Sequence, residues 1–151
     1  MNTAVLFSSA SDEWETPNDF YAEMNCEFGF TLDVAASHTN YKCVPYLTAQ
    51  DDALSIAWSG VCWCNPPYSR GLQGKFIAKA AAERLKGVTT VMLLPARTDT
   101  KAFHAHIYDA SRWQARDGVE IRLLPGRLKF GGAVNSAPFP SMVVVFRGGV
   151  L

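Results

Sequence analysis

The sequence predicts an α/β fold with a mainly parallel sheet and one antiparallel strand near the C-terminus. Helix-like and strand-like segments alternate along the chain, which is typical of parallel strands joined by helices. The last two strand-like segments are joined by a loop rich in Gly and Pro, which indicates an antiparallel pair. A length of 151 residues suits one domain, spanning 1–151, with one hydrophobic core.

One helix and three strands are expected in the first half. Thr16 and Pro17 have the residue types of a helix N-cap and a first helical position, and an apolar face at helical spacing follows them. Residues 28–34 and 61–64 are apolar enough for buried strands. Residues 44–48 give a weaker strand pattern because a proline interrupts it.

The second half is expected to hold two helices and four strands. The first helix, at 73–86, is rich in Ala and Lys and is followed by a glycine that suits its end. The second is expected to begin at a cap on Thr98 or Asp99 and to end near Ala110. The predicted strands lie at 88–94, 119–124, 128–130 and 142–146. The last two of these are expected to pair as the arms of a hairpin-like unit.

The composition is that of an ordinary folded protein. Apolar residues make up 48% of the chain and charged residues 19%, which argues against a disordered segment. No apolar stretch approaches the length of a membrane span. Residues 1–12 lack the basic start and the long apolar run of a signal peptide, so we expect a short flexible tail and a cytoplasmic protein.

Charge is distributed unevenly although the formal net charge is zero. Residues 1–55 hold nine acidic side chains and one basic one, whereas residues 66–151 hold thirteen basic and five acidic ones. A basic half favours a polyanionic partner such as nucleic acid. The alternative is solvated surface charge that is segregated without a function.

Neither the cysteines nor the histidines have the spacing of a metal site. The cysteines are Cys26, Cys43, Cys62 and Cys64, and the histidines are His38, His104 and His106. The pair in Cys-x-Cys falls on one face of a strand, where small thiols pack well, and the paired Cys-x-x-Cys spacing typical of zinc sites is missing. We therefore expect reduced thiols in the core and no bound metal.

Polar residues follow the predicted strands where ligands bind in open α/β sheets, at the carboxyl ends. Asp33 ends one strand, and the sequence Asn-Pro-Pro-Tyr at 65–68 follows another. Two prolines hold the chain extended without backbone donors, and the Asn side chain adds a carbonyl acceptor. Such acceptors can hold both hydrogens of an exocyclic amine, and the Tyr ring can stack on a base. The alternative is a simple turn, since both Asn-Pro and Pro-Pro are common turn dipeptides.

Several motifs occur in an order that is shared with a known family. Asn-Pro-Pro-Tyr resembles the signature of amino-methyltransferases that use S-adenosylmethionine. "WETPNDFYAEM" looks like the Thr-Pro cofactor motif of one class of DNA adenine methyltransferases, and "FTLDVAAS" lies at the place of the first cofactor-binding strand and loop. With "LLPARTDT", "GRLKF" and "APFPSMVVVF", the sequence resembles the phage-type Dam family, the DNA N6-adenine methyltransferases of phages and prophages. The resemblance covers about residues 14–146 and implies a Rossmann-like methyltransferase fold.

The resemblance implies roles for individual residues. Cofactor contacts are implied for Trp14, Thr16, Pro17, Asp33 and the loop residue Ala35, and for Asp51 or Asp52 on the cofactor adenine. Catalytic or substrate roles are implied for Asn65, Pro66, Pro67 and Tyr68, with Phe130 as a second aromatic wall. Arg97 is expected either to bind phosphate or to pair with an acid. Since the target base must reach such a pocket, the resemblance also implies duplex DNA with a flipped adenine as the partner.

The sequence departs from the family pattern in three ways. The loop "VAAS" replaces the glycines that many methyltransferases place beside the cofactor. An acid for the cofactor ribose is not evident after the second strand. The chain also has no room for a separate target-recognition domain. We therefore expect DNA specificity to come from loops such as 69–74 and 131–137 or from a homodimer, or else to be relaxed. Two alternatives therefore remain: an amino-methyltransferase of protein glutamine or RNA, and a non-catalytic relative that binds DNA or a host enzyme.

Overall fold

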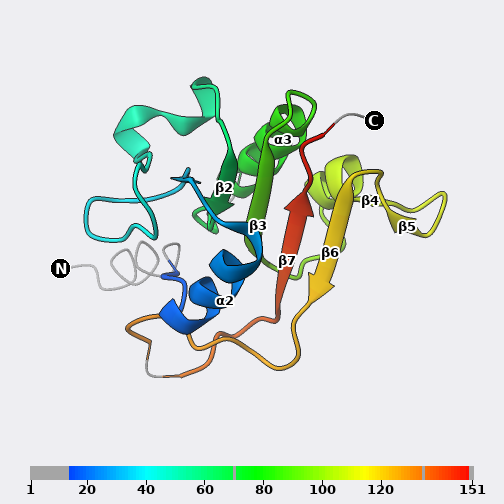
Figure 1. Ribbon diagram of the computed structural model, residues 1–151. Coiled ribbons are helices and arrows are strands. Elements are labelled where there is room, and N and C mark those ends of the chain that lie inside the picture. Colours follow the sequence, from blue (N-terminus) through cyan, green and yellow to red (C-terminus); the bar gives the residue numbers. More distant parts are fainter. Residues whose placement is uncertain (1–13, 70, 134, 150–151) are drawn as a thin grey trace.

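The computed structural model describes residues 14–69, 71–133 and 135–149, so the tail expected at 1–12 lies outside the described residues. A mixed α/β structure is built around a five-stranded sheet of order β1-β2-β3-β7-β6 (Figure 1). The helical elements are α2 (Asn18–Phe28), η1 (Ala49–Asp51), η2 (Ala53–Ser55), α3 (Leu72–Arg84) and η3 (Phe103–Ile107). The sheet strands are β1 (Leu32–Asp33), β2 (Val61–Cys64), β3 (Thr89–Pro95), β6 (Val119–Leu123) and β7 (Ser141–Phe146). A separate hairpin consists of β4 (Tyr108–Asp109) and β5 (Gln114–Ala115).

Strand directions confirm the predicted mainly parallel sheet with an antiparallel strand near the C-terminus. β1 pairs with β2, and β2 with β3, in parallel. β7 is antiparallel to both of its neighbours, β3 and β6, so β6 runs in the same direction as β3. The carboxyl ends of β1, β2 and β3 consequently lie at one edge of the sheet.

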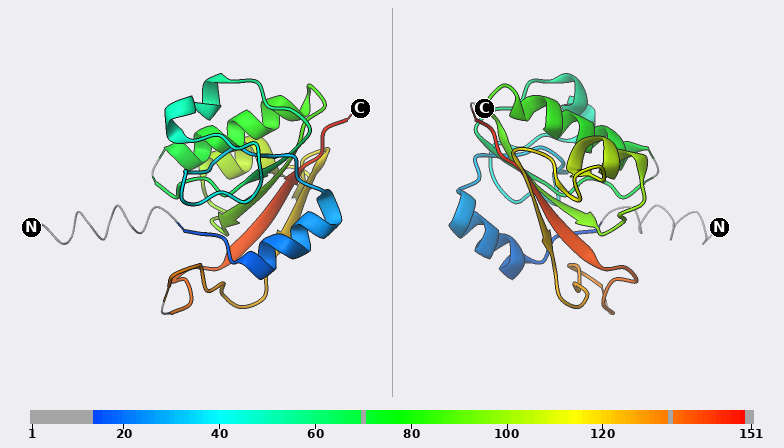
Figure 2. Two further views of the ribbon diagram at one scale, coloured as in Figure 1. Left: turned by 60° about the vertical axis from the view of Figure 1, so that its left-hand side comes forward. Right: turned by 90° about the vertical axis from the view of Figure 1, so that its right-hand side faces the viewer.

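Helices cover both faces of the sheet (Figure 2). α3 and η3 pack on one face, where they bury Met92 and Leu94 of β3 together with Val144 of β7. α2 packs on the other face, over Val91 and Leu93 of β3. Alternate residues of the same strands thus enter two separate cores, which explains why residues 91–95 of β3 and 142–146 of β7 are continuously apolar.

Two expectations for the first half were wrong. The helix α2 continues through Phe28, where a strand was expected, because Gly29 in the left-handed region (φ 67°) ends it and donates to the Asn25 carbonyl at 2.9 Å. The strand that follows is correspondingly short. Residues 44–48 form no strand: bends lie at 44 and 45, and one isolated parallel bridge joins Asp33 and Tyr46.

Two expectations for the second half were also wrong. Residues 128–130 form no strand, and β7 pairs with β3 and β6 instead. The helix expected from Thr98 or Asp99 to Ala110 begins later and ends at Ile107, with the Phe103 N–H bound to the Thr100 hydroxyl at 3.2 Å.

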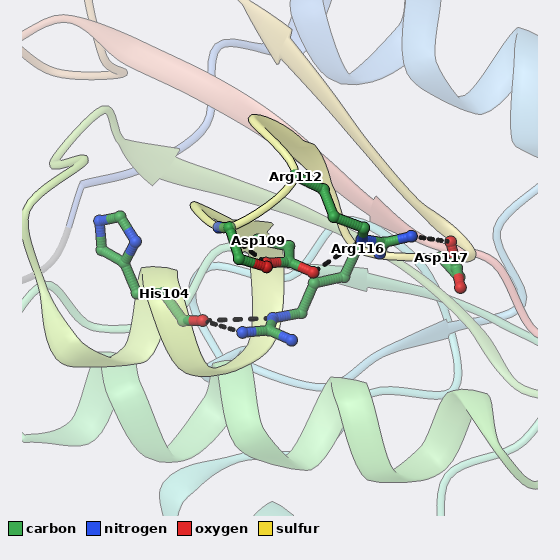
Figure 3. A network of polar contacts seen from close by, with 6 residues as sticks. His104, Asp109, Arg112, Arg116 and Asp117 are labelled. Carbon is green, nitrogen blue, oxygen red and sulfur yellow. Dashed lines mark hydrogen bonds and ion pairs between the residues drawn. The ribbon is translucent and has the colours of Figure 1, made fainter.

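The hairpin β4–β5 follows η3 directly and is fixed by polar side chains (Figure 3). Arg112 lies between Asp109, at 2.7 Å, and Asp117, at 3.4 Å. Arg116 Nε donates to the His104 carbonyl at 3.2 Å, which ties the hairpin to η3. Exposed pairs of this kind contribute little to stability, so their effect is mainly to fix the shape of the hairpin.

A close approach near the C-terminus predicts the effect of adding one methyl group. A Cβ at Gly148 would lie 2.3 Å from the backbone carbon and 2.4 Å from the carbonyl oxygen of Gly87, whereas a Cβ at Gly149 would meet nothing within 4 Å. We expect Gly148→Ala to lower the free energy of unfolding by about 1–3 kcal/mol, since backbone atoms would have to move. Gly149→Ala is the matched control and should change it by less than about 0.5 kcal/mol. Urea unfolding of both variants tests this expectation, and equal midpoints would contradict it.

Among the described residues, no helix combines the length and the apolar character needed to span a membrane.

Candidate active site

A cavity of about 440 Å³ opens at the carboxyl ends of β1 and β2. Its size is within the usual range for small-molecule sites, roughly 300–1,000 Å³, and ligands of open α/β sheets bind at this edge. Its walls are Trp14 and Thr16 before α2, residues 33–38, 40 and 42 after β1, residues 48–50 and 52–54 around η1 and η2, and Trp63, residues 65–67, Leu72 and Phe76 from β2 and α3.

Most of the site residues predicted from the sequence meet at this cavity. Those that line it are Trp14, Thr16, Asp33, Ala35, Asp52, Asn65, Pro66 and Pro67. Those that do not are Pro17, Asp51, Tyr68, Arg97 and Phe130. Residues from four separate stretches of the sequence therefore converge, as the rule for strand ends predicted for Asp33 and Asn65.

Asn65 is held by its amide nitrogen. Nδ2 donates to the carbonyl oxygen of Trp14 and to the hydroxyl of Thr16, the latter at 2.9 Å. Its carbonyl oxygen Oδ1 is buried and has no hydrogen-bond partner among the described residues. A buried acceptor without a partner costs free energy, so a donor supplied by a ligand would be bound favourably here.

Thr16 and Pro17 differ from their expected roles at the helix terminus. The helix begins at Asn18, so Pro17 is the cap residue, and it makes no side-chain cap. The Thr16 hydroxyl is not used as a cap; it accepts from Asn65 instead, and the side chain is buried. The Thr-Pro pair thus begins the helix one residue later than predicted and leaves a hydroxyl at the cavity.

Asp33 brings a buried carboxylate to the same cavity. Its Oδ1 accepts from the Ala35 N–H at 3.1 Å and its Oδ2 from the Lys42 N–H at 2.9 Å. Burial raises the pKa of Asp33 to about 6, although these two hydrogen bonds act in the opposite direction. A desolvated carboxylate of this kind favours a cationic ligand, because a positive charge in direct contact would stabilise its charged form.

Asp51 and Asp52 have different environments. Asp51 Oδ2 accepts from the backbone N–H of Thr48 at 2.8 Å and from its hydroxyl at 3.1 Å, and these bonds lower the pKa of the carboxyl. Asp52 lines the cavity and adopts a left-handed backbone conformation (φ 52°). The Asp51 carboxylate therefore takes part in the cap of η1, whereas Asp52 lines the cavity where a ligand can bind.

Tyr68 and Phe130 belong to an aromatic cluster beside the cavity. Trp14, Tyr68 and Phe130 pack edge to face, with centroids 5.3 Å apart for Trp14–Phe130 and 6.3 Å apart for Tyr68–Phe130. The Tyr68 hydroxyl donates to the Leu93 carbonyl at 3.1 Å, and burial raises its pKa well above the ordinary range. Phe130 is only 2% exposed, so in this conformation it supports its aromatic neighbours and forms no wall of the cavity.

Arg97 follows β3 and is exposed. No carboxylate among the described residues forms an ion pair with it, so the expected alternative of an acid partner has no support there. It lies outside the cavity, at the same edge of the sheet.

Sequence reasoning missed several cavity residues. His38 and Lys42 come from the loop after β1, Gln50 from η1, and Phe76 from the first turns of α3. Their closeness in sequence to Asp33 or Asn65 is the one signal that could have indicated them. Loop positions show no hydrophobic periodicity from which a contact could be predicted. Within the described part of the chain, no group of three or more His, Cys, Asp or Glu side chains could hold a metal ion.

Comparisons with known proteins agree with this geometry. The chain is 36% identical over 106 residues to the "DNA N-6-adenine-methyltransferase" of Haemophilus phage HP1, a match that covers 68% of this chain and 60% of that protein. It is 40% identical over 65 residues to the "Putative methyltransferase YfdM" of Escherichia coli K12, covering 38% of this chain and 71% of that protein. The phage match thus spans less than two thirds of its relative. A family model described as DNA N-6-adenine-methyltransferase (Dam) matches residues 4–148, and the chain therefore belongs to this Dam family.

Proposed function

We propose that this protein transfers a methyl group from S-adenosylmethionine to N6 of adenine in DNA. The observation that carries the proposal is the Asn65 carbonyl oxygen, which is buried at the cavity and has no hydrogen-bond partner in the part of the chain that the structure describes. The exocyclic N6 amine of adenine is a donor of two hydrogens and fits this acceptor together with the Pro66 carbonyl. Membership of the Dam family supports the same substrate.

The cavity has the donor and acceptor groups that such a cofactor needs. When bound, S-adenosylmethionine supplies an electrophilic methyl group on a positively charged sulfur. We assign Asp33 to the cationic methionine end, because its buried carboxylate forms no ion pair with a basic side chain of the described residues. Trp14 and Ala35 line the same space and would exclude water from it. Together with the antiparallel β7 between β3 and β6, this site supports a Rossmann-like methyltransferase fold.

The chain's own residues would act by positioning and electrostatics. Asn65 Oδ1 accepts a hydrogen from the N6 amine and thereby holds the nitrogen lone pair towards the methyl donor. Positive charge would develop on this nitrogen as it takes the methyl group and the carbon–sulfur bond of the donor breaks. The adjacent amide oxygen would stabilise that charge until the amine releases a proton to water. The rigid Pro66-Pro67 segment keeps this acceptor in place without adding backbone donors that would compete for it.

DNA would approach the edge that carries Arg97 and the aromatic cluster. Tyr68, held by the Leu93 carbonyl, would stack on an adenine flipped out of the duplex. The exposed Arg97 would bind a backbone phosphate, as the excess of basic residues in the second half favours. We place the reaction in the bacterial host cytoplasm, with recognition by the loops at 69–74 and 131–137 or by a homodimer; positions 70 and 134 of those loops lie outside the described residues.

One assay tests the function. The protein is incubated with S-adenosylmethionine labelled on the methyl group and, separately, with duplex DNA, RNA and protein. We expect label in DNA as N6-methyladenine. Label only in protein or RNA would overturn the proposed substrate, and cofactor binding without transfer to any of them would indicate a non-catalytic relative.

Asp51 and Asp52 give a matched pair for the cofactor site. We expect Asp52→Asn to weaken cofactor binding by about tenfold, since a charged acceptor facing the cavity is lost. Asp51→Asn should leave the affinity close to that of the wild type and lower the melting temperature instead, because Asp51 caps η1. Calorimetric titration and thermal unfolding of both variants test this assignment, and the reverse pattern would assign the cofactor contact to Asp51.

A further inference from the structure

We propose that Thr16 is a positioning residue that fixes the amide of Asn65, so that Oδ1 and not Nδ2 faces the amine to be methylated. This inference rests on the proposed function, because it assigns a role within that reaction. It starts from one contact: Asn65 Nδ2 lies 2.9 Å from Thr16 Oγ1, across 49 positions of sequence.

The hydrogen-bond acceptors around Asn65 determine which end of its side-chain amide faces the substrate. An amide turned by 180° occupies the same space but exchanges two donors for an acceptor. Trp14 offers a backbone carbonyl, which can only accept, so the turned amide would place two oxygens against each other. It would also turn the NH₂ group towards the amine of the substrate, where donor would face donor. The Trp14 carbonyl therefore selects the productive orientation.

Thr16 completes this selection by taking the second hydrogen. With both Nδ2 hydrogens bound, the plane of the Asn65 amide is fixed, and Oδ1 is left as its one unused polar atom. The Thr16 side chain is 2% exposed, so water has little access to replace it. The helix α2 leaves this hydroxyl available, since its cap residue is Pro17.

Kinetics of matched variants test the role. Thr16→Val keeps the shape and removes the acceptor, and we expect kcat for DNA methylation to fall by about tenfold, the loss of one hydrogen bond. The KM for the cofactor should stay within about twofold, and Thr16→Ser should restore most of kcat. Equal activity of the Val and Ser variants, or a loss confined to the KM for the cofactor, would overturn the proposal.

Thr90→Val is the matched control. Thr90 is fully buried on β3 and does not line the cavity, so the same substitution removes a hydroxyl elsewhere in the core. We expect its kcat to equal that of the wild type. A similar fall in kcat for Thr90→Val would mean that loss of any buried hydroxyl slows the enzyme, which would overturn the specific role of Thr16.

A second readout does not depend on activity. The side-chain amide signals of Asn65 in a ¹⁵N–¹H spectrum can be assigned by their loss in Asn65→Asp. We expect one of the two protons to shift upfield and exchange faster in Thr16→Val, and both to remain near their wild-type positions in Thr16→Ser. Unchanged signals in Thr16→Val would overturn the inference even in an active enzyme. A wild-type protein that methylates no DNA would overturn the proposed function, whereas the hydrogen bond is judged by the spectrum alone.

Discussion

Asn65→Ala is expected to lower methyl transfer to DNA by at least about 100-fold, while cofactor affinity stays within a few-fold of the wild type. The substitution removes the buried oxygen that would hold the N6 amine, and a single preorganised group of this kind is commonly worth 10²–10³ in kcat. The measurement is single-turnover methylation of duplex DNA at saturating cofactor, with binding of the cofactor determined separately.

Loss of folding must be separated from loss of chemistry in this variant. Truncation also leaves the Trp14 carbonyl and the Thr16 hydroxyl without their donor, which destabilises the segment before α2. Asn65→Leu keeps the volume and removes the amide, so it provides a second test with less repacking. Both variants should bind the cofactor and fail in transfer. If either retains most of the wild-type rate, the N6 amine is not held by Asn65.

Elements with a strong local pattern were predictable from the sequence. The strand at 61–64 has the predicted bounds, and α3 and β3 differ from prediction by one or two residues at each end. Apolar runs and strong helix formers favour a strand or a helix through neighbouring residues alone, so these elements can be predicted without knowledge of long-range contacts. Gly29 shows where this fails: a strand was expected over residues 28–34, but a glycine in the left-handed region ends a helix after Phe28.

The candidate site was predictable only in part. Asp33 and Asn65 were expected at one edge because parallel strands end there together, and they line one cavity. The partners of Asn65 were not predictable, since Thr16 lies 49 positions away and its residue type indicated a helix cap. The family resemblance implied Phe130 as an aromatic wall, but only tertiary packing decides whether such a ring faces a cavity or a core.

The buried carboxylate of Asp33 predicts how cofactor binding depends on pH. Its pKa is raised to about 6 in the free protein, because burial disfavours the charged form. A cationic group bound against this carboxylate favours the charged form, so binding must displace a proton below that pH. We expect affinity for S-adenosylmethionine to be constant just above the pKa and about tenfold weaker at pH 5 than at pH 7.

The raised pKa of Asp33 affects folding stability in the opposite sense to cofactor binding: stability falls as pH rises. For a carboxyl whose folded pKa is raised, the stabilising contribution is fully present below the unfolded value and is lost as pH rises through about 6. The contribution of Asp33 to the stability of the free protein should therefore be lost between about pH 4 and 6, and bound cofactor should cancel that loss. Because the lowered pKa of His106 acts in the opposite direction, the comparison is with Asp33→Asn. An equal dependence of melting temperature on pH in the wild type and in Asp33→Asn would contradict the assigned burial of this charge.

Asp33→Asn tests whether this carboxylate causes the pH dependence. His38 lines the same cavity, so His38→Asn is the matched control. In Asp33→Asn we expect weaker binding at pH 7 and a nearly flat dependence down to pH 5, because no carboxylate remains to be protonated. The slope should persist in His38→Asn, and a slope that persists in Asp33→Asn would overturn the assignment to this carboxylate. Calorimetric titration of both variants at pH 5, 6 and 7 makes the test. An Asp33 origin would mean that the carboxylate whose burial destabilises the free protein is the group that binds the cationic end of the cofactor.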